Sequence, residues 1–367
     1  MPTTAHPLAR YGWDEERAAS FAPYAAEGLT PGRIVRVDRG RCDLVVPGTD
    51  GEEAATRTVL ADSALVTTGD PLNIMCTGDW AAVDLATGYV RALLPRRTAF
   101  VRSTSSKRSE GQVLAVNVDL AVIAVSLAEE FDPGRLERFL ALAWESGATP
   151  LVVLTKADLV GDPAALAYLV ADAEAAAPGA TVLAVSAETG EGLDVLAAVL
   201  TDGTSVLLGR SGAGKSTLAN ALVGERVQDT HDIRDRDGKG RHTTTARTLL
   251  PLAGGGVLID TPGLRGVGLW DAEHGVGRTF AEIEELAARC RFHDCAHTAE
   301  PGCAVLAAVE TGELPARRLD SYRKLIRENA HIAARTDARL RAEMRREWKS
   351  KQAEGRRMLE IKRGPRR

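Results

Sequence analysis

A glycine-rich run that ends in lysine and serine is the segment of this sequence with the clearest chemistry. It follows the apolar stretch TSVLL and precedes the helix-like stretch TLANALV, and its residues are Gly209, Arg210, Ser211, Gly212, Ala213, Gly214, Lys215 and Ser216. The spacing matches G-x-x-x-x-G-K-[ST], in which backbone amides and a helix N-terminus surround a polyphosphate. We expect Lys215 to reach the β- and γ-phosphates and Ser216 to bind Mg²⁺.

Two segments downstream have the residues that usually face the other side of a bound triphosphate. Asp260 ends the apolar stretch GVLID and can hold the hydration shell of Mg²⁺, and the backbone amide of Gly263 can meet the γ-phosphate. One hydroxyl of the threonine run 243–245 is expected on Mg²⁺, and Thr244 is our candidate. The charged, glycine-containing stretch 229–241 is typical of a switch segment that orders and disorders.

Two strand ends upstream predict recognition of guanine. The strand-like stretch PLVVL is followed by Thr155, Lys156, Ala157 and Asp158, and a later one by Ser186 and Ala187. The Asp158 carboxylate can accept from both N1 and the 2-amino group of guanine, a donor pair that adenine lacks. Lys156 would lie along the base or ribose, and the Ser186–Ala187 backbone would offer an amide to O6. The alternative, an ATPase with the same phosphate loop, would leave the Thr-Lys-Ala-Asp motif without a role in base recognition.

The order of these motifs is unusual, because the base-reading residues precede the phosphate loop. From residue 117 onward, strands and helices alternate, which predicts a doubly wound α/β domain with a mostly parallel sheet. Ligands bind at the carboxyl edge of such a sheet, so a chain cut in one surface loop and rejoined elsewhere keeps its site. The sequence therefore predicts a circularly permuted P-loop GTPase domain, whose segment after Gly263 leads into the C-terminal region.

Three cysteines and a histidine are gathered in a short loop near the C-terminus. Cys290, Cys295, His297 and Cys303 supply three thiolates and an imidazole, a set that suits one closed, structural Zn²⁺ site. His293 is a possible substitute ligand, and buried free cysteines are the alternative reading. Cys42 and Cys76 stand alone in strand-like contexts and are expected in the core.

The chain divides into five predicted parts: an N-terminal arm (1–29), an OB-fold β-barrel (30–96), a polar basic linker (97–116), the permuted GTPase domain (117–277) and a helical zinc-binding domain with a basic tail (278–367). Five or so short strands within about 65 residues favour the barrel. Arg33, Arg36, Arg39 and Arg41 alternate along its first hairpin. They could form a nucleic-acid-binding face or merely solubilise an outer sheet face.

Charge is distributed unevenly along the 367 residues, whose net charge is −4. From residue 315 onward there are 18 lysines and arginines against 7 acids, a net charge of +11, which leaves −15 on the remainder. The basic end suggests a polyanionic partner such as ribosomal RNA, with a solvated basic helix as the alternative. No apolar run is long enough for a membrane span, and the N-terminus lacks the apolar core of a signal peptide. We expect a cytoplasmic monomer with no membrane partner.

These motifs together resemble one family, the small-ribosomal-subunit biogenesis GTPases known as RsgA or YjeQ. The resemblance rests on GRIVRVDRG, PRRTAFVR, TKAD, SAETGEGL, GRSGAGKSTLAN, GRHTTT, DTPG and the Cys-Cys-His-Cys loop, and it covers about residues 28–330. It implies an enzyme that hydrolyses GTP to GDP and phosphate, slowly alone and faster on the small ribosomal subunit. Such an enzyme acts late in subunit maturation, and hydrolysis times its release. By position, residues 155–158 and 209–217, including Thr217, would bind GTP, and the four loop residues would bind zinc.

Two positions depart from the common GTPase pattern. Thr155 replaces an asparagine, which is expected to weaken a tether to the phosphate loop, and Leu264 stands where many GTPases have a water-orienting glutamine. The family implies His242 as the replacement, so His242 and Lys215 are the catalytic candidates. His242 could instead pack the switch segment or touch RNA. Leu264 favours the alternative function, an RNA-binding assembly module in which GTP is chiefly a sensed ligand.

Overall fold

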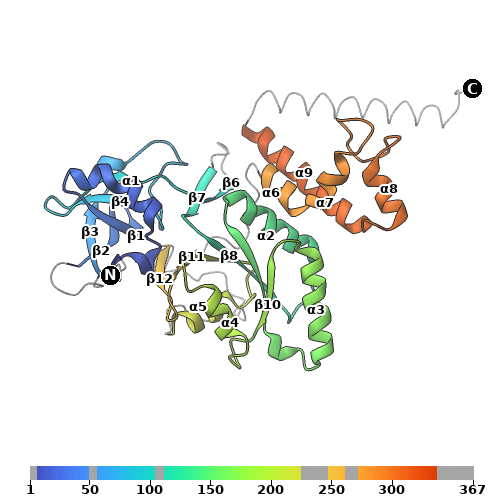
Figure 1. Cartoon of the computed structure of the whole chain (residues 1–367), viewed down its shortest axis with the longest axis horizontal. Coiled ribbons are helices and arrows are strands. Elements are labelled where there is room, and N and C mark those ends of the chain that lie inside the picture. The colour runs from blue at the N-terminus through green and yellow to red at the C-terminus, as the bar shows by residue number, and fades with distance from the viewer. Residues whose placement is uncertain (1–5, 49–55, 104–110, 225–246, 261–271, 337–367) are drawn as a thin grey trace, which may run out of the picture.

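The computed structural model describes residues 6–48, 56–103, 111–224, 247–260 and 272–336 of the chain. Three parts lie in a row, with the β-barrel at one end, the α/β domain in the centre and a group of helices at the other end (Figure 1). Within the described residues, no helix is both long and apolar enough to cross a membrane.

The predicted OB-like barrel is confirmed. Its strands run in the order β1-β2-β3-β5-β4, and β4 pairs back onto β1 to close the ring. Alternate side chains of each strand point inward and form an apolar interior that includes Ile34, Leu44 and Val90. The strands are β1 (Thr30–Asp38), β2 (Arg41–Pro47), β3 (Thr56–Asp62), β4 (Trp80–Asp84) and β5 (Tyr89–Leu93), with the 3₁₀ turn η2 (Ala64–Val66) after β3.

The N-terminal segment packs against the outside of this barrel. A 3₁₀ turn, η1 (Ala9–Tyr11), is followed by helix α1 (Glu15–Ala26), whose first turn is capped by the Asp14 carboxylate accepting from the Arg17 amide at 2.9 Å. Phe21 of α1 is buried in one apolar cluster with Trp80 of the barrel, and Trp13 lies edge-on to both rings. The segment is therefore part of the folded barrel unit.

The central domain has the predicted doubly wound sheet. Its strand order is β10-β9-β8-β11-β13-β12, and all neighbours are parallel except β12 and β13, which form the expected hairpin. Strands β9 and β10, which carry the predicted base-side motifs, precede β11 in sequence and lie in the same sheet, which is the permuted order. The strands are β8 (Leu120–Ser126), β9 (Thr149–Thr155), β10 (Thr181–Val185), β11 (Thr204–Leu208), β12 (Thr248–Pro251) and β13 (Val257–Asp260).

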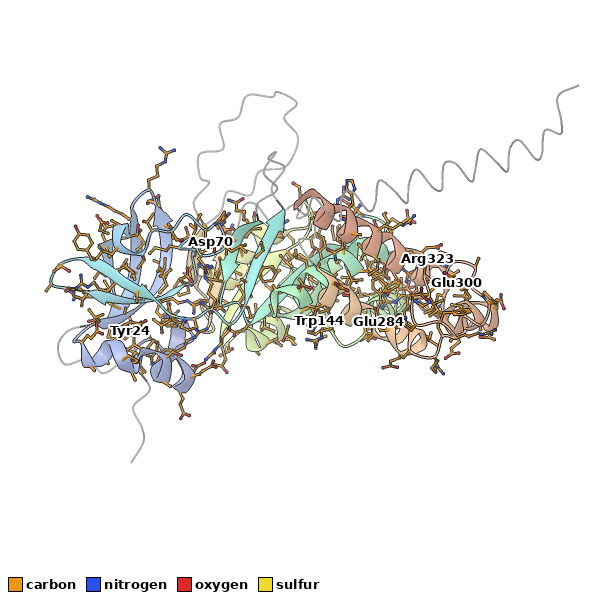
Figure 2. All side chains as sticks on the ribbon, turned by 90° about the horizontal axis from the view of Figure 1, so that it is seen from above. Tyr24, Asp70, Trp144, Glu284, Glu300 and Arg323 are labelled. Atoms are coloured by element: carbon orange, nitrogen blue, oxygen red, sulfur yellow. The ribbon has the colours of Figure 1, made fainter. Side chains whose placement is uncertain are left out.

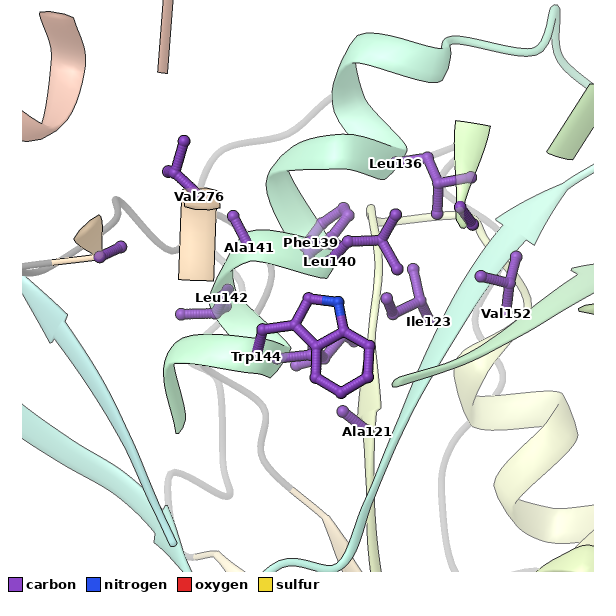
Figure 3. Close-up of a cluster of buried hydrophobic side chains, with 14 of the residues drawn as sticks. Ala121, Ile123, Leu136, Phe139, Leu140, Ala141, Leu142, Trp144, Val152 and Val276 are labelled. Carbon is purple, nitrogen blue, oxygen red and sulfur yellow. The ribbon is translucent and has the colours of Figure 1, made fainter. Parts of the chain in front are cut away.

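Helices cover both faces of this sheet, namely α2 (Pro133–Ser146), α3 (Pro163–Ala176), α4 (Leu193–Val199) and α5 (Lys215–Val223). Helix α2 packs on one face of the sheet, where Leu136, Leu140 and Trp144 share an apolar cluster with Ile123 and Val152 (Figure 3). Leu136 and Leu140 are each 1% exposed, and truncating such a leucine to alanine typically lowers the free energy of unfolding by about 2–5 kcal/mol. The position of α2 is therefore firmly fixed on the sheet.

The predicted linker contains a β-hairpin, which corrects that expectation. Strands β6 (Ala99–Ser103) and β7 (Gly111–Val116) pair antiparallel. Phe100 and Leu114 are fully buried in the core that contains α2. The polar residues near 104–110 obscured two short apolar runs, AFV and VLAV, that each have strand character.

Barrel and central sheet are joined by strand pairing and by a buried arginine. Thr248 of β12 pairs with Arg36 of β1, so the two sheets are continuous. Arg33, one of the four arginines considered for a nucleic-acid face, is only 1% exposed. Its guanidinium donates to the Thr204 hydroxyl at 2.9 Å and to the Asn117 carbonyl at 3.2 Å, and it stacks over Trp80. A residue that binds the neighbouring domain cannot lie on an RNA-binding face, so Arg33 is removed from that set.

The C-terminal part is helical, as predicted, and consists of α6 (Glu273–Thr279), α7 (Ala281–Ala287), α8 (Ala304–Thr311) and α9 (Ala316–Thr336). It is attached to α2 through a buried charge cluster. Arg318 of α9 donates to the fully buried Glu137 of α2 at 2.9 Å and to Glu282 at 2.6 Å. Paired in this way, neither buried charge is left without a partner.

Candidate nucleotide and metal sites

The glycine-rich run forms the loop between β11 and α5 at the carboxyl edge of the sheet. Gly209 has φ 134°, and a Cβ atom there would lie 2.5 Å from the Ala124 carbonyl oxygen, so only glycine fits this close approach. Lys215, the first residue of α5, donates from Nζ to the Gly209 carbonyl at 2.8 Å and also to that of Arg210. Ser216 is half-buried and Thr217 exposed in the same first turn.

The Thr155 hydroxyl joins the base-side strand to this loop. The side chain is 4% exposed, and its Oγ1 lies 2.9 Å from the Ala213 carbonyl oxygen and 3.3 Å from that of Val125. The sequence predicts that threonine in place of asparagine weakens such a tether. A hydroxyl can donate as an amide does, and here the strand brings it close enough to do so.

The two predicted base-side motifs also meet. Ser186 at the end of β10 donates from Oγ to the Asp158 carboxylate at 2.6 Å, and the same oxygen accepts from the amides of Glu188 and Thr189 at 3.2 and 3.1 Å. Lys156 has a left-handed backbone, φ 62°, in the turn that leads into the 3₁₀ segment η3 (Ala157–Leu159). Asp158 is exposed and therefore open to a ligand, whereas Ala157 is buried and Ala187 half-buried.

Two contacts of this site are not evident from the sequence. The Ser186–Ala187 motif predicts only a backbone role, whereas the Ser186 hydroxyl holds the Asp158 carboxylate. The second contact involves Glu129, whose carboxylate lies 2.5 Å from the Arg210 guanidinium at the phosphate loop. Glu129 is 81 residues away in sequence and belongs to no motif, so only the fold identifies it.

Several predicted residues lie outside the described part of the chain. These are His242, the threonine run with Thr244, Gly263 and Leu264. Asp260 is described and ends β13, which pairs with β11 directly before the phosphate loop. The described portion of the nucleotide site therefore comprises the base side, the phosphate loop and Asp260.

The four predicted zinc ligands are brought together. The ligand atoms of Cys290, Cys295, His297 and Cys303 all lie within 4.8 Å of one another. His297 Nδ1 lies 3.6 Å from Cys290 Sγ and 3.4 Å from Cys303 Sγ, and those two sulfurs are 3.8 Å apart. Four ligands about 2.3 Å from a central zinc have edges of about 3.8 Å. The donor set and its spacing therefore fit one tetrahedral metal ion such as zinc.

The loop that carries these ligands is held by its own backbone. The Glu300 carboxylate accepts from the amides of Ala296, Thr298 and Ala299 at 3.1, 2.7 and 3.0 Å, and these bonds lower its pKa to about 2. Arg323 of α9 donates to the His297 carbonyl. Figure 2 shows Glu300 and Arg323 in this region at the end of the molecule opposite the barrel.

The two other cysteines are core residues, as predicted. Cys42 is 1% and Cys76 is 4% exposed. Burial raises the pKa of the Cys42 thiol to about 12 and that of Cys76 to about 11. Both thiols therefore stay protonated near neutral pH and behave as small apolar side chains.

Comparison with known proteins gives a consistent result. A family model described as RsgA GTPase matches residues 93–270. The chain is 69% identical over 364 residues to the small ribosomal subunit biogenesis GTPase RsgA of Streptomyces avermitilis, covering 99% of this chain and 96% of that protein. The protein of the same name from Streptomyces coelicolor is 68% identical over 359 residues, covering 97% of this chain and 96% of that protein.

Solved structures share the fold. The crystal structure of YjeQ from Thermotoga maritima matches with a TM-score of 0.59 and 25% identity, covering 82% of this chain and 98% of that chain. YloQ, described as a circularly permuted GTPase, matches with a TM-score of 0.60 and 24% identity, covering 82% of this chain and 95% of that chain. The second similarity concerns the fold alone.

Proposed function

The chain belongs to the RsgA family of small ribosomal subunit biogenesis GTPases, which are GTP-hydrolysing enzymes, and from this premise we propose that it acts late in maturation of the small subunit. It hydrolyses GTP to GDP and phosphate, the subunit stimulates hydrolysis, and hydrolysis times release. The protein works as a cytoplasmic monomer. The identity to the two Streptomyces proteins supports the subunit as partner, and the hydrogen bond that joins the base-side strand to the phosphate loop through Thr155 supports the nucleotide site.

We propose that this edge of the sheet binds GTP with Mg²⁺. Asp158 reads the guanine base with Ser186 positioning its carboxylate, and the Ala187 amide faces O6. The loop from Gly209 to Thr217 surrounds the phosphates, Lys215 contacts the β- and γ-phosphates, and Ser216 binds Mg²⁺. Thr244, Asp260 and Gly263 complete the γ-phosphate side.

Hydrolysis requires a side chain that orients the attacking water, and Leu264, which follows the DTPG motif, cannot do so. Leu264 has no polar atom in its side chain, so we assign this role to His242, with Lys215 stabilising charge on the phosphates. His242→Ala should reduce subunit-stimulated turnover at least tenfold with unchanged nucleotide affinity. Unchanged turnover would remove His242 from the mechanism.

The partner of the proposed enzyme is the small ribosomal subunit and its RNA. The net charge of +11 from residue 315 onward suits a phosphate backbone, with the basic residues of the tail contacting it. The Cys₃His loop holds one structural Zn²⁺, whose four ligands leave no position open for water.

Steady-state hydrolysis of GTP and of ATP, with and without isolated small subunits, tests the proposal. Slow GTP-specific turnover that rises sharply with subunits is expected. Turnover indifferent to subunits would remove the subunit as activator but leave the GTPase assignment. GTP binding to subunit-bound protein with negligible hydrolysis would instead favour the alternative, an RNA-binding assembly module that senses GTP, for which Leu264 is the supporting feature.

A further inference from the structure

We propose that Phe292, in the loop between the first two zinc ligands, is a stacking platform for an unpaired RNA base. The inference rests on the proposed RNA partner and names one place where that partner is recognised. The exposed Arg289 and Arg291 flank the ligand Cys290 in the same loop, and we assign them to the phosphates beside the base.

The exposure of Phe292 is unusual within this chain. All six phenylalanines are described, and Phe292, 42% exposed, is the only one of them that is not at least half-buried. Tyr168 is the other large exposed aromatic residue among the described ones, at 75%, and it lies on α3. An aromatic ring left in water loses the stabilisation that burial gives, so its position invites a functional explanation.

Hydrogen bonds fix the backbone that carries the Phe292 ring. The Phe292 carbonyl accepts from the Cys295 amide at 3.3 Å, and the neighbouring Arg291 amide donates to the Gly302 carbonyl at 3.1 Å. The Arg291 stem lies against Gly302, where an added Cβ would approach it to 3.1 Å. A ring carried on such a constrained backbone loses little conformational entropy when a base stacks on it.

The charges around the ring favour a nucleic acid over an apolar protein groove. The Arg291 guanidinium carbon lies 5.4 Å from the Phe292 ring centroid, so a planar cation and an aromatic ring form one surface. Within the described part of the chain, neither Arg289 nor Arg291 forms an ion pair. Among the described residues 272–332, no other large apolar side chain is exposed, and the exposed chain neighbours Arg291, His293 and Asp294 are polar, so no apolar patch extends from the ring. Unpaired bases are commonly recognised by aromatic rings with adjacent guanidinium groups.

The test compares four substitutions in the full-length, zinc-loaded protein. Phe292→Ala removes the ring, Phe292→Trp keeps an aromatic face, and Phe292→Leu keeps apolar volume without one. Tyr168→Ala is the matched control, since it removes an exposed aromatic residue from the central domain. The probes are a single-stranded RNA of about 12 nucleotides carrying 2-aminopurine, the same RNA in a duplex, and isolated small subunits. Zinc content is measured for each variant.

Phe292→Ala and Phe292→Leu should each weaken single-strand binding about tenfold or more, as losing one stacked base does. Phe292→Trp should restore binding and 2-aminopurine quenching, and Tyr168→Ala should have no effect. Binding restored by leucine, or unchanged in Phe292→Ala while the wild type binds, would overturn the inference but leave the RNA partner intact. Failure of the wild type to bind both single-stranded RNA and subunits would overturn the proposed function as well.

Discussion

At the residue scale, two hydroxyl groups of the proposed nucleotide site hold other groups in place. Thr155 bonds the phosphate loop, and Ser186 bonds the Asp158 carboxylate. The side chains of Thr155 and Ser186 are both buried, whereas the Asp158 carboxylate is exposed and open to a ligand. The residues proposed to recognise the base and those proposed to bind the phosphates are thus held by short hydrogen bonds from buried hydroxyl groups.

Replacing Thr155 tests that connection. Thr155→Val keeps the shape but leaves the Ala213 carbonyl without its donor at a buried position, which should cost about 1 kcal/mol, roughly a fivefold loss of GDP affinity. Thr155→Ser keeps the hydroxyl and should bind nearly as well as the wild type. Isothermal titration with GDP measures both. Equal affinity of the valine variant would show that the bond does not support binding.

Asp158→Asn tests how the base is read. The amide presents a donor where guanine also presents donors, so GTP affinity should fall about 100-fold or more, while xanthosine triphosphate, with an acceptor oxygen at C2, should gain affinity. Competition with a fluorescent GTP analogue measures both ligands. If GTP affinity stayed unchanged in this variant, Asp158 would not contact the base.

At the element scale, the Cys₃His loop connects α7 to α8, and Cys303 also caps α8, where its sulfur accepts from the Leu306 amide at 3.4 Å. A metal ion here would therefore fix the start of a helix as well as the loop. Val305 of α8 is fully buried in the core shared with α2, so the loop also determines how these helices pack.

Cys303→Ser should abolish stoichiometric zinc and destabilise the helical part by about 3 kcal/mol or more, given apparent structural-zinc binding energies of about 10–16 kcal/mol. Zinc content by atomic emission and helicity during urea unfolding are the measurements. Cys42→Ser is the control, because Cys42 is buried in the barrel far from the cluster. That variant should keep one zinc per chain, and zinc retention by Cys303→Ser would rule out the assigned ligand set.

At the scale of the whole molecule, two buried arginines connect the three parts. Arg33 joins the barrel to the central domain, and Arg318 joins the helical part to α2. Burial of Arg33, with the nearby positive charge of Arg17, lowers its pKa to about 9. A guanidinium is retained at this cost only where its hydrogen bonds matter, so these junctions are expected to be rigid.

Glu137→Ala tests the second junction, because it leaves Arg318 buried without its α2 carboxylate. Destabilisation of about 3–5 kcal/mol is expected, seen as a lower urea midpoint. Arg135→Ala, on the same helix, breaks an exposed pair with Asp132 at 3.2 Å and should cost less than about 1 kcal/mol. Similar losses from both changes would show that burial of the cluster is unimportant.

Much of this protein was determined by short, local patterns. Each predicted motif, namely the phosphate loop, the two base-side motifs and the metal-ligand loop, occupies a few neighbouring residues whose chemistry requires particular spacing. The order of these motifs along the chain is enough to indicate the permutation. Apolar periodicity likewise predicted the barrel and the mostly parallel sheet, because the sides of strands and helices that face the core repeat regularly.

Only the tertiary structure decided the features that depend on contacts between distant residues. The sequence pattern predicts that Arg33 is exposed, but its guanidinium donates to the Thr204 hydroxyl of the central domain. The segment predicted to be a linker contains a hairpin that packs on α2. Glu129 meets Arg210, and Glu137 meets Arg318, across separations of 81 and 181 residues. Local sequence determines which chemistry a segment can perform, whereas burial and long-range pairing depend on how the whole chain packs.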